Sequence, residues 1–256
     1  MTSRQRIWTA AALVIGDEIL SGRTQDRNVA QIASWLGVQG IRLTEVRIVA
    51  DDAGAIAKAL KALQGAYDYV FTTGGIGPTH DDITVDAIAA ALGVPVVIHP
   101  EARAILERYY ENRGGLTEAR LRMARVPEGA ELIRNRMSGA PGIRIGNLFI
   151  MAGVPAIAAG MLDALTGELE GGAPLLSATV GAWVGESDVA DLLRDTERAF
   201  AAGAGCAIGS YPFFRDGRTG ANFVVRSTDA AVLDDAAKAL VTGLRAIGRE
   251  AVPGGI

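Results

Sequence analysis

The residues best suited to ligand chemistry form a glycine-rich segment, Gly74-Gly75-Ile76-Gly77-Pro78-Thr79, between a predicted strand at 67–72 and a helix predicted to begin at Asp82. Glycines let the backbone approach a phosphate closely and turn its N–H groups toward it. The dipole of the following helix favours an anion. The segment is neither a P-loop nor a dinucleotide fingerprint, because it lacks the Lys-Ser/Thr pair and its glycines are spaced Gly-Gly-x-Gly. A tight strand-to-helix turn without a ligand fits the same spacing, so both interpretations stay open.

Carboxylates are predicted to gather at one edge of the sheet. Asp17 and Glu18 follow the first predicted strand, Asp51 follows the second, and Asp81 and Asp82 follow the glycine segment. The carboxyl ends of parallel strands share an edge, where open α/β sheets bind ligands. Several carboxylates would repel a phosphate unless a cation lay between them. The pattern therefore indicates a Mg²⁺-type ion held by one or two carboxylates and by substrate phosphates. Taken singly, Asp51 and Asp82 also suit plain helix N-caps.

Two further loops are expected to close over the ligand. The first is Ser138-Gly139-Ala140-Pro141-Gly142, and the second is Gly153-Val154-Pro155. Their glycine and proline content suits structural turns equally well, so this alternative also stays open.

Composition limits the class of protein. Of the 256 residues, 49% are hydrophobic and 5% are aromatic, which suits helices packed on a sheet and argues against disorder. The formal net charge is -4, with acids and bases interspersed, so no nucleic-acid partner is expected. The single cysteine, Cys206, excludes an internal disulfide, and no apolar run reaches the roughly 20 residues of a membrane span. These features predict a cytoplasmic protein without a membrane partner.

Alternating strands and helices must position the candidate residues. Strands are predicted at 8–15, 41–49, 67–72, 94–98 and 148–151, and helices are predicted from about 26, 51, 82, 100, 117 and 155. Repeated strand–helix units predict an α/β fold with a mainly parallel sheet and helices on both faces. The polar, glycine-rich stretch 167–174 is the expected linker. We therefore predict one domain at 1–168 and a small α+β domain at 175–256 with the order β-α-β-β-α.

In chain order, the motifs resemble those of the molybdenum-cofactor-biosynthesis (molybdopterin-binding) domain family, and most of all its competence/damage-inducible protein A (CinA) branch. The similarity covers about residues 8 to 165. Its motifs are Ile15-Gly16-Asp17-Glu18-Ile19-Leu20-Ser21-Gly22, Asp26 and Asn28, Val49-x-Asp51, the Gly-Gly-Ile-Gly-Pro-Thr-x-Asp-Asp-Ile-Thr run, and Ser-Gly-Ala-Pro-Gly. The tail, with Gly185-Glu186-Ser187 and Ile208-Gly209-Ser210-Tyr211-Pro212, resembles the KH-like unit that follows this domain in the CinA branch.

The resemblance implies a three-layer α/β/α fold that is usually oligomeric, so a homo-oligomer is expected. Relatives bind molybdopterin, whereas the CinA branch is associated with metal-dependent hydrolysis of a diphosphate bond in ADP-ribose or FAD-like compounds. The expected function is therefore a nucleotide pyrophosphatase that takes a small phosphorylated ligand and uses divalent Mg²⁺, Mn²⁺ or Co²⁺. The alternative is a molybdopterin-binding protein or transferase of molybdenum cofactor biosynthesis without hydrolase activity.

By position in the motifs, Asp82 and Asp51 are the expected catalytic carboxylates, and Asp82, Asp51 and Asp17 are the expected metal ligands. The other expected ligand contacts lie in the motifs and loops described above: Gly16, Asp17, Glu18, Ser21, Gly22, Asn28, Thr73, Gly74, Gly75, Gly77, Pro78, Thr79, Asp81, Thr84, Gly139, Ala140, Pro141, Gly142, Gly153 and Pro155.

Two departures from the family pattern affect function. The third loop commonly reads Pro-Gly-Val-Pro-x-Glu-Met in the family, but here the glutamate is replaced by Ile157, so one polar contact or metal ligand is expected to be missing. Larger CinA proteins continue into an amidohydrolase domain, and that activity is not expected in this chain. The KH-like tail lacks a Gly-x-x-Gly clamp with basic flanks, so a structural or dimer-forming role is expected for it.

Overall fold

The computed structural model describes residues 6–256 and divides into two compact units, Met1–Gly172 and Ala173–Ile256. The boundary falls inside the stretch 167–174 that was predicted as a linker. The first five residues of the predicted 1–168 domain lie outside the described residues.

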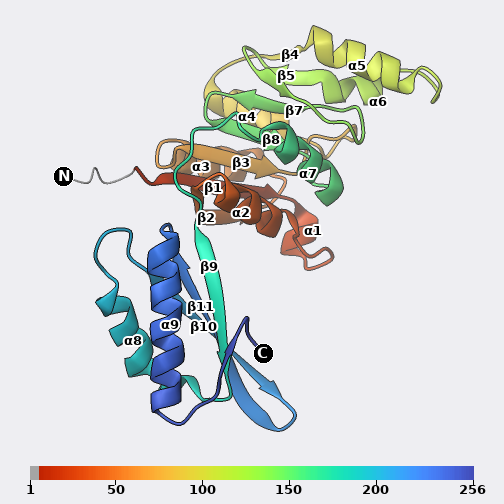
Figure 1. Ribbon diagram of the computed structural model, residues 1–256. Coiled ribbons are helices and arrows are strands. Elements are labelled where there is room, and N and C mark those ends of the chain that lie inside the picture. The colour runs from red at the N-terminus through yellow and green to blue at the C-terminus, as the bar shows by residue number, and fades with distance from the viewer. Residues whose placement is uncertain (1–5) are drawn as a thin grey trace. The chain divides into compact units, whose positions relative to one another are not determined.

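The N-terminal unit is built on a six-stranded sheet with the order β2-β1-β3-β8-β7-β6. The strands β1 (Trp8–Ile15), β2 (Ile41–Val49), β3 (Tyr69–Thr73) and β8 (Leu148–Met151) run parallel. The sheet continues with β7 (Gly142–Ile145), which is antiparallel to β8, and with β6 (Glu131–Ile133), which is antiparallel to β7. The mainly parallel sheet predicted from the sequence is confirmed, and Figure 1 shows the strands between their helices.

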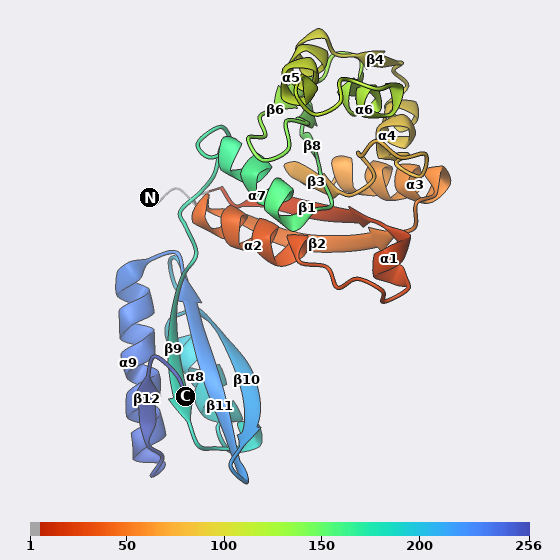
Figure 2. The ribbon, with the colours of Figure 1, turned by 90° about the vertical axis from the view of Figure 1, so that its right-hand side faces the viewer.

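Helices cover both faces of this sheet, as Figure 2 shows from the side. The helices α3 (Ala53–Gln64) and α4 (Thr84–Leu92) pack on one face, and α2 (Asn28–Val38) and α7 (Pro155–Ala164) pack on the other. Alternation along β1 explains the two cores, because Leu13 points into one core while Ala12 points into the other. The three-layer fold is therefore confirmed.

Connecting segments between α4 and β7 differ most from the sequence expectation. The helix predicted over 117–125 is only α6 (Glu118–Leu121) and the short 3-10 helix η1 (Arg122–Ala124). It ends there because β5 (Arg125–Pro127) pairs with β4 (Val96–Ile98) as a separate two-stranded sheet. The strands β6 and β7 were not predicted. The remaining elements of this unit are α1 (Asp17–Leu20) and α5 (Pro100–Tyr110).

The C-terminal unit contains a four-stranded antiparallel sheet with the order β10-β11-β9-β12. Its elements are β9 (Leu176–Ala182), η2 (Glu186–Asp188), α8 (Ala190–Ala199), β10 (Ala207–Arg215), β11 (Arg218–Ser227), α9 (Ala230–Ala246) and β12 (Ala251–Pro253). The helices α8 and α9 pack on one face of the sheet through a shared apolar core. The order β-α-β-β-α matches the expectation, and β12 adds a strand. Within residues 6–256, no helix has the length and apolar content needed to cross a bilayer.

Candidate functional site

The glycine segment forms a tight turn between β3 and α4. Gly74 and Gly75 have φ angles of 102° and 66°, which L side chains rarely adopt. A Cβ atom at Gly74 would lie 2.0 Å from the carbonyl oxygen of Ile15, and one at Gly75 would lie 2.2 Å from Oγ1 of Thr84. Close packing on the side of the sheet therefore explains two of the glycines without a ligand.

The opposite side of the same turn carries unpaired donors. The amide of Gly74 donates to the carbonyl oxygen of Met151 over 3.2 Å, and the carbonyl of Gly75 accepts from the amide of Thr84 over 3.1 Å. Between these two bonds, the amides of Gly75, Ile76 and Gly77 find no protein acceptor in the part of the chain that the structure describes. Three successive free N–H groups at a glycine turn form the kind of concave donor site that binds anions.

A pocket of about 520 Å³ opens in front of these amides. One wall is the turn itself, from Gly74 to Pro78, together with Asp82 and Glu18, and the other walls are largely apolar. These apolar walls come from the end of α5, from η1, from the 138–140 loop and from the start of α7: Tyr110, Met123, Ala140, Ala152, Val154, Ile157 and Met161. The pocket therefore combines a polar end that suits phosphates with an apolar end that suits a ring.

Asp82 lies in this pocket, but not as a helix cap. One of its carboxylate oxygens accepts the amide of Thr79 over 2.8 Å and also accepts the Thr79 hydroxyl. The N-cap position of α4 is Ile83, which makes no side-chain cap bond, so the interpretation of Asp82 as an N-cap is wrong. The cause is local geometry, because the turn places the carboxylate over Gly77, where a Cβ would come within 2.6 Å of it. The carboxylate stiffens the turn while lining the pocket.

Asp51 occupies a different part of the rim. The N-cap of α3 is Asp52, whose carboxylate accepts from the amide of Ala55 over 2.8 Å, so Asp51 is free of that role. Its own carboxylate accepts from the amide of Asp17 over 2.9 Å. The pKa of Asp51 is raised, first by burial and then by nearby negative charges, although the bond from Asp17 opposes the shift. The loops after β1 and β2 therefore meet, as their shared sheet edge requires.

The charges that raise the pKa of Asp51 belong to Asp17, Glu18 and Asp81. Acids from three loops thus lie close enough to repel one another, which is the arrangement predicted from the strand ends. However, within residues 6–256 no group of three or more His, Cys, Asp or Glu side chains is arranged to hold a metal ion, so Asp82, Asp51 and Asp17 do not form the predicted set of ligands by themselves. A cation at this rim would need oxygens from a bound ligand.

Several predicted contacts support the pocket rather than line it. Asn28 donates through Nδ2 to the carbonyl of Gly153 over 2.8 Å, while its buried Oδ1 has no partner. The hydroxyls of Thr73 and Thr84 are also buried without partners. Ser21 donates to the carbonyl of Glu18. The other predicted contacts that lie outside the pocket lining are Gly16, Asp17, Gly22, Asp51, Thr79, Asp81, Gly139 and Gly142.

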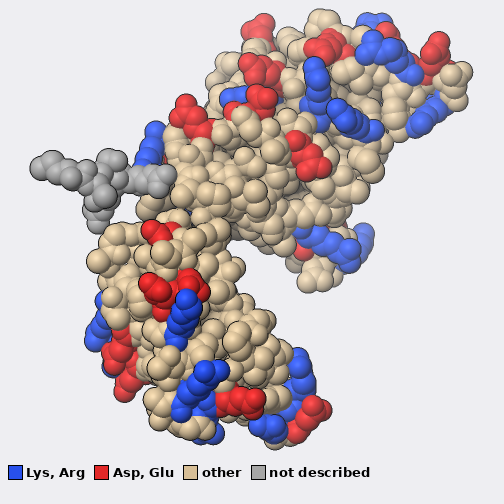
Figure 3. Space-filling model, viewed as in Figure 1, with Lys and Arg blue, Asp and Glu red and all other residues tan. Residues whose placement is uncertain are grey.

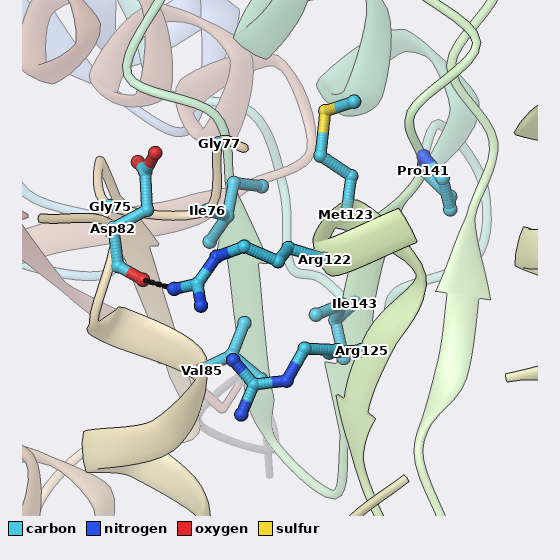
Figure 4. A pocket seen from close by; sticks show the side chains of 10 residues that line it. All are labelled: Gly75, Ile76, Gly77, Asp82, Val85, Arg122, Met123, Arg125, Pro141 and Ile143. Atoms are coloured by element: carbon cyan, nitrogen blue, oxygen red, sulfur yellow. Dashed lines mark hydrogen bonds between the residues drawn. The ribbon is translucent and has the colours of Figure 1, made fainter. Parts of the chain in front are cut away.

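Three arginines and an aromatic ring in this region escaped sequence reasoning. Arg122 donates to the main-chain carbonyl of Asp82 over 3.3 Å, while the Asp82 carboxylate points away from the guanidinium group (Figure 4). Arg122, Arg125 and Pro141 line a narrow cleft of about 10 Å³ beside the turn. Arg125 is neutralised by Asp86 of α4, but Arg122 forms no carboxylate pair among the described residues. The sequence did not indicate that Arg122 and Arg125 line this cleft, because both lie in a segment that was expected to be helical.

The other missed residues are Tyr110, whose ring lines the main pocket, and Arg120, whose guanidinium lies 4.2 Å from the centre of that ring. Arg120 also donates to the carbonyls of Arg113 and Gly115, which ties the loop after α5 to the ring. A tyrosine and an arginine ten residues apart carry no recognisable motif, so only the folded chain reveals this wall.

Comparison with known proteins identifies the class. Residues 11–171 match the family model described as "Probable molybdopterin binding domain", and the chain therefore belongs to that family. Residues 174–250 match a second model, described as "FAD synthase, middle domain". Fold and site are thus those of a molybdopterin-binding-type domain joined to a second conserved unit.

Individual relatives refine this assignment to the CinA-like part of the family. A CinA-like protein from Citrifermentans bemidjiense is 43% identical over 148 residues, which cover 56% of this chain and 36% of the relative. A "Probable FAD synthase" from Caenorhabditis elegans is 32% identical over 260 residues, covering 93% of this chain and 49% of the relative. Among solved structures, CinA from Thermoplasma acidophilum has a TM-score of 0.59 at 32% identity and covers 63% of this chain and 98% of its own. The chain spans about half or less of the length of these curated relatives.

Proposed function

We propose that the N-terminal unit is a nucleotide pyrophosphatase that hydrolyses a diphosphate bond in an ADP-ribose or FAD-like compound with the help of a divalent cation. The observation that carries the proposal is that the amides of Gly75, Ile76 and Gly77 have no protein acceptor among the described residues, while all three residues line the open pocket. Preorganised N–H groups stabilise the charge that develops on a phosphate during transfer.

The pocket supports the same substrate class by its shape. At about 520 Å³ it lies within the range of small-molecule sites, and its apolar walls offer a surface for a nucleobase or flavin ring. The ring of Tyr110 and the side chains of Met123 and Ile157 belong to those walls. A ligand with a phosphate at one end and a planar ring at the other uses both ends of the site.

A divalent cation fits the donor set only in part, and Asp51 is the protein ligand that we propose for it. The side chain accepts one hydrogen bond, and the charges of Asp17, Glu18 and Asp81 around it would be relieved by a positive ion. Because no protein cluster completes a site by itself, we propose that the substrate phosphates supply the remaining oxygens. When bound, such an ion would neutralise the diphosphate and acidify a coordinated water.

Asp82 is the pocket carboxylate that we assign to the attacking water. One oxygen is held by Thr79, which fixes the orientation of the group, and we propose that the other accepts the water proton. The water oxygen forms a bond to one phosphorus, the bridging P–O bond breaks, and the second phosphate leaves with the bridging oxygen. Two monophosphates result, with no oxidant or second substrate.

The comparisons support an FAD-related enzyme at a coarser level. The C-terminal match is to a domain of FAD synthases, and one relative that aligns over nearly the whole chain is named for that activity. That relative is about twice as long as the aligned region, so its synthase activity is not carried over to this chain.

The test is hydrolysis of ADP-ribose and FAD with Mg²⁺, Mn²⁺ or Co²⁺, followed by chromatography of the released monophosphates. Asp82→Asn retains an acceptor for Thr79 but removes the charge, so we expect an unchanged fold and a rate at least roughly 100-fold lower. A matched control is Asp163→Asn in α7, which neutralises a carboxylate outside the pocket. Full hydrolysis by Asp82→Asn would refute the assigned role.

Molybdopterin binding without hydrolysis is a second candidate, favoured by the apolar wall at Ile157. A pterin diphosphate presents the same ring and phosphate chemistry. Saturable binding of molybdopterin, with ADP-ribose and FAD both left intact in the presence of metal, would support this candidate over the first.

A further inference from the structure

The C-terminal sheet carries a second surface with its own chemistry. Its helices cover one face only, which buries Phe223 and Val225 of β11. Side chains alternate along a strand, so their neighbours in sequence point to the opposite face, which no helix covers. The end of the chain crosses the middle of this face, where Ile256 exchanges two hydrogen bonds with the side chain of Asn222. Strand pairing places Tyr211 beside Asn222, Phe213 beside Gly220 and Arg215 beside Arg218 on that face.

On either side of that segment, this face gathers rings and guanidinium groups, from Trp183, Tyr211, Phe213, Arg215, Arg218 and Arg226. We call it the aromatic–arginine face. Trp183 and Phe213 form an edge-to-face pair with centroids 5.3 Å apart. The guanidinium carbon of Arg218 lies 4.3 Å from the centre of the Trp183 ring, and that of Arg226 lies 5.8 Å from the Tyr211 ring. Arg226 also donates to the Tyr211 hydroxyl, which fixes the position of both groups.

Glycines explain how the rings lie on the sheet. A Cβ atom at Gly220 would come within 2.5 Å of the Phe213 ring, and one at Gly209 would come within 3.1 Å of the Tyr211 ring. Each ring therefore packs against bare backbone, and each has a guanidinium group near it, that of Arg226 at Tyr211 and that of Arg215 at 5.3 Å from the centre of Phe213. Tyr211 is 48% exposed, and Phe213 and Trp183 are half-buried.

Charge is segregated between the two faces of this unit. On the helical side, Arg194, Arg198 and Arg249 each have a carboxylate within 4.0 Å. On the aromatic–arginine face, none of the arginines forms an ion pair with a carboxylate among residues 6–256. Figure 3 shows basic side chains around a small acidic patch at the lower right of the C-terminal unit, where Figure 1 places the β10–β11 hairpin. Asp216, at the tip of that hairpin, forms no ion pair with Arg215 or Arg218.

We propose that the aromatic–arginine face binds single-stranded nucleic acid. Exposed aromatic rings on a sheet stack with bases of any sequence, and interleaved arginines meet the phosphates. Tyr211 and Phe213 are two residues apart on one strand, a spacing of about 6.8 Å that offers successive platforms along a chain of nucleotides. A second copy of the same face is disfavoured because symmetric pairing would bring arginines against arginines. The expectation of no nucleic-acid partner rested on whole-chain charge, which averages over this local separation.

The experiment measures binding of fluorescein-labelled oligo(U) of 15 nucleotides to the full chain by anisotropy at several KCl concentrations. We expect the triple variant Arg215→Gln, Arg218→Gln, Arg226→Gln to bind at least tenfold more weakly. Its slope of log affinity against log salt should be shallower by about 2, since each lost phosphate contact contributes about 0.7 for single strands. Tyr211→Ala should weaken binding several-fold with the slope unchanged, because stacking releases no counterions.

A matched control makes the same charge change on the helical side, with Arg194→Gln, Arg198→Gln and Arg249→Gln, and should bind within twofold of wild type. Equal loss in both triple variants, no binding by wild type, or displacement of the oligomer by a tenfold excess of free ADP would overturn the proposal. Self-association that is lost only in the first variant would instead assign the face to a second copy. Hydrolysis at the N-terminal site should be unchanged in both triple variants, which keeps this test separate from the proposed activity.

Discussion

The amide of Asp17 donates a 2.9 Å hydrogen bond to the carboxylate of Asp51, which joins the loop after β1 to the loop after β2. This bond holds the Asp51 carboxylate at a rim where burial, and then the charges of neighbouring acids, raise its pKa. Carboxyl groups with shifted pKa values concentrate at functional sites, so the raised pKa makes Asp51 a candidate functional residue.

Replacing Asp51 by Asn should raise stability and lower activity together. A carboxyl whose pKa is raised by folding contributes stability below its unfolded pKa and loses that contribution as the pH rises through the folded pKa. At pH 7 the ionised Asp51 therefore costs stability, and we expect the variant to melt about 1–3 °C higher than wild type. The difference should vanish below about pH 4. Hydrolysis should fall roughly 10–100-fold, as for other metal-site substitutions. A lower melting temperature at pH 7 would contradict the assignment.

Substitution of Gly75 tests whether the close packing of the glycine turn is needed for stability and for ligand binding. Gly75→Ala places a methyl group at φ 66° and 2.2 Å from Oγ1 of Thr84, so we expect a loss of roughly 2–4 kcal/mol in the free energy of unfolding and much weaker ligand binding. Gly93→Ala is the control, because Gly93 has φ 72° but nothing within 4 Å of the added atom. It should lose about 1 kcal/mol from backbone strain and keep its ligand affinity. Chemical denaturation and calorimetric titration with ADP-ribose would measure both quantities.

Ile157 tests the apolar end of the pocket. Ile157→Glu would bring a charge into the apolar wall, so we expect FAD to bind at least fivefold more weakly. Ile157→Leu, which preserves volume and polarity, should stay within twofold. Fluorescence titration of FAD gives the affinities. Tighter binding by the glutamate variant would show that the ligand presents a donor to this wall instead of an apolar ring.

A fragment of residues 1–172 should retain ligand affinity within about twofold. All residues that line the main pocket lie between Glu18 and Met161, inside the first compact unit, which has its own two apolar cores. Titration of ADP-ribose into the fragment and into the full chain makes the comparison. A fragment that folds cooperatively but does not bind would show that the second unit contributes to the site.

Sequence reasoning worked where one physical signal dominated. The strands β1 and β2 were predicted with the bounds that the structure gives. The first is a buried apolar run and the second alternates apolar with polar residues, and both patterns are typical of strands. The convergence of Asp17 and Asp51 followed from topology, since parallel strands end at one edge. Position along the chain was enough for both inferences, and side-chain detail was not needed.

Prediction failed where tertiary contacts decided the outcome. The segment 117–125 has helical periodicity, but Arg125 and its neighbours pair with β4 instead. The Asp82 carboxylate bonds to Thr79 rather than to α4, a choice between two local partners that composition does not reveal. Tyr110 and Arg122 reach the site because separate loops fold over it, and no spacing rule relates them to the glycine turn.

The close approach of Gly153 to Gly74 has a mechanical consequence. A Cβ at Gly153 would lie 3.3 Å from the Cα of Gly74, so the backbone before α7 rests directly on the start of the glycine turn. Since α7 also supplies Ile157 and Met161 to the apolar wall, a shift of this helix would be passed to the backbone that carries the donor amides. We therefore expect binding of a ring at one end of the pocket and binding of a phosphate at the other to depend on each other.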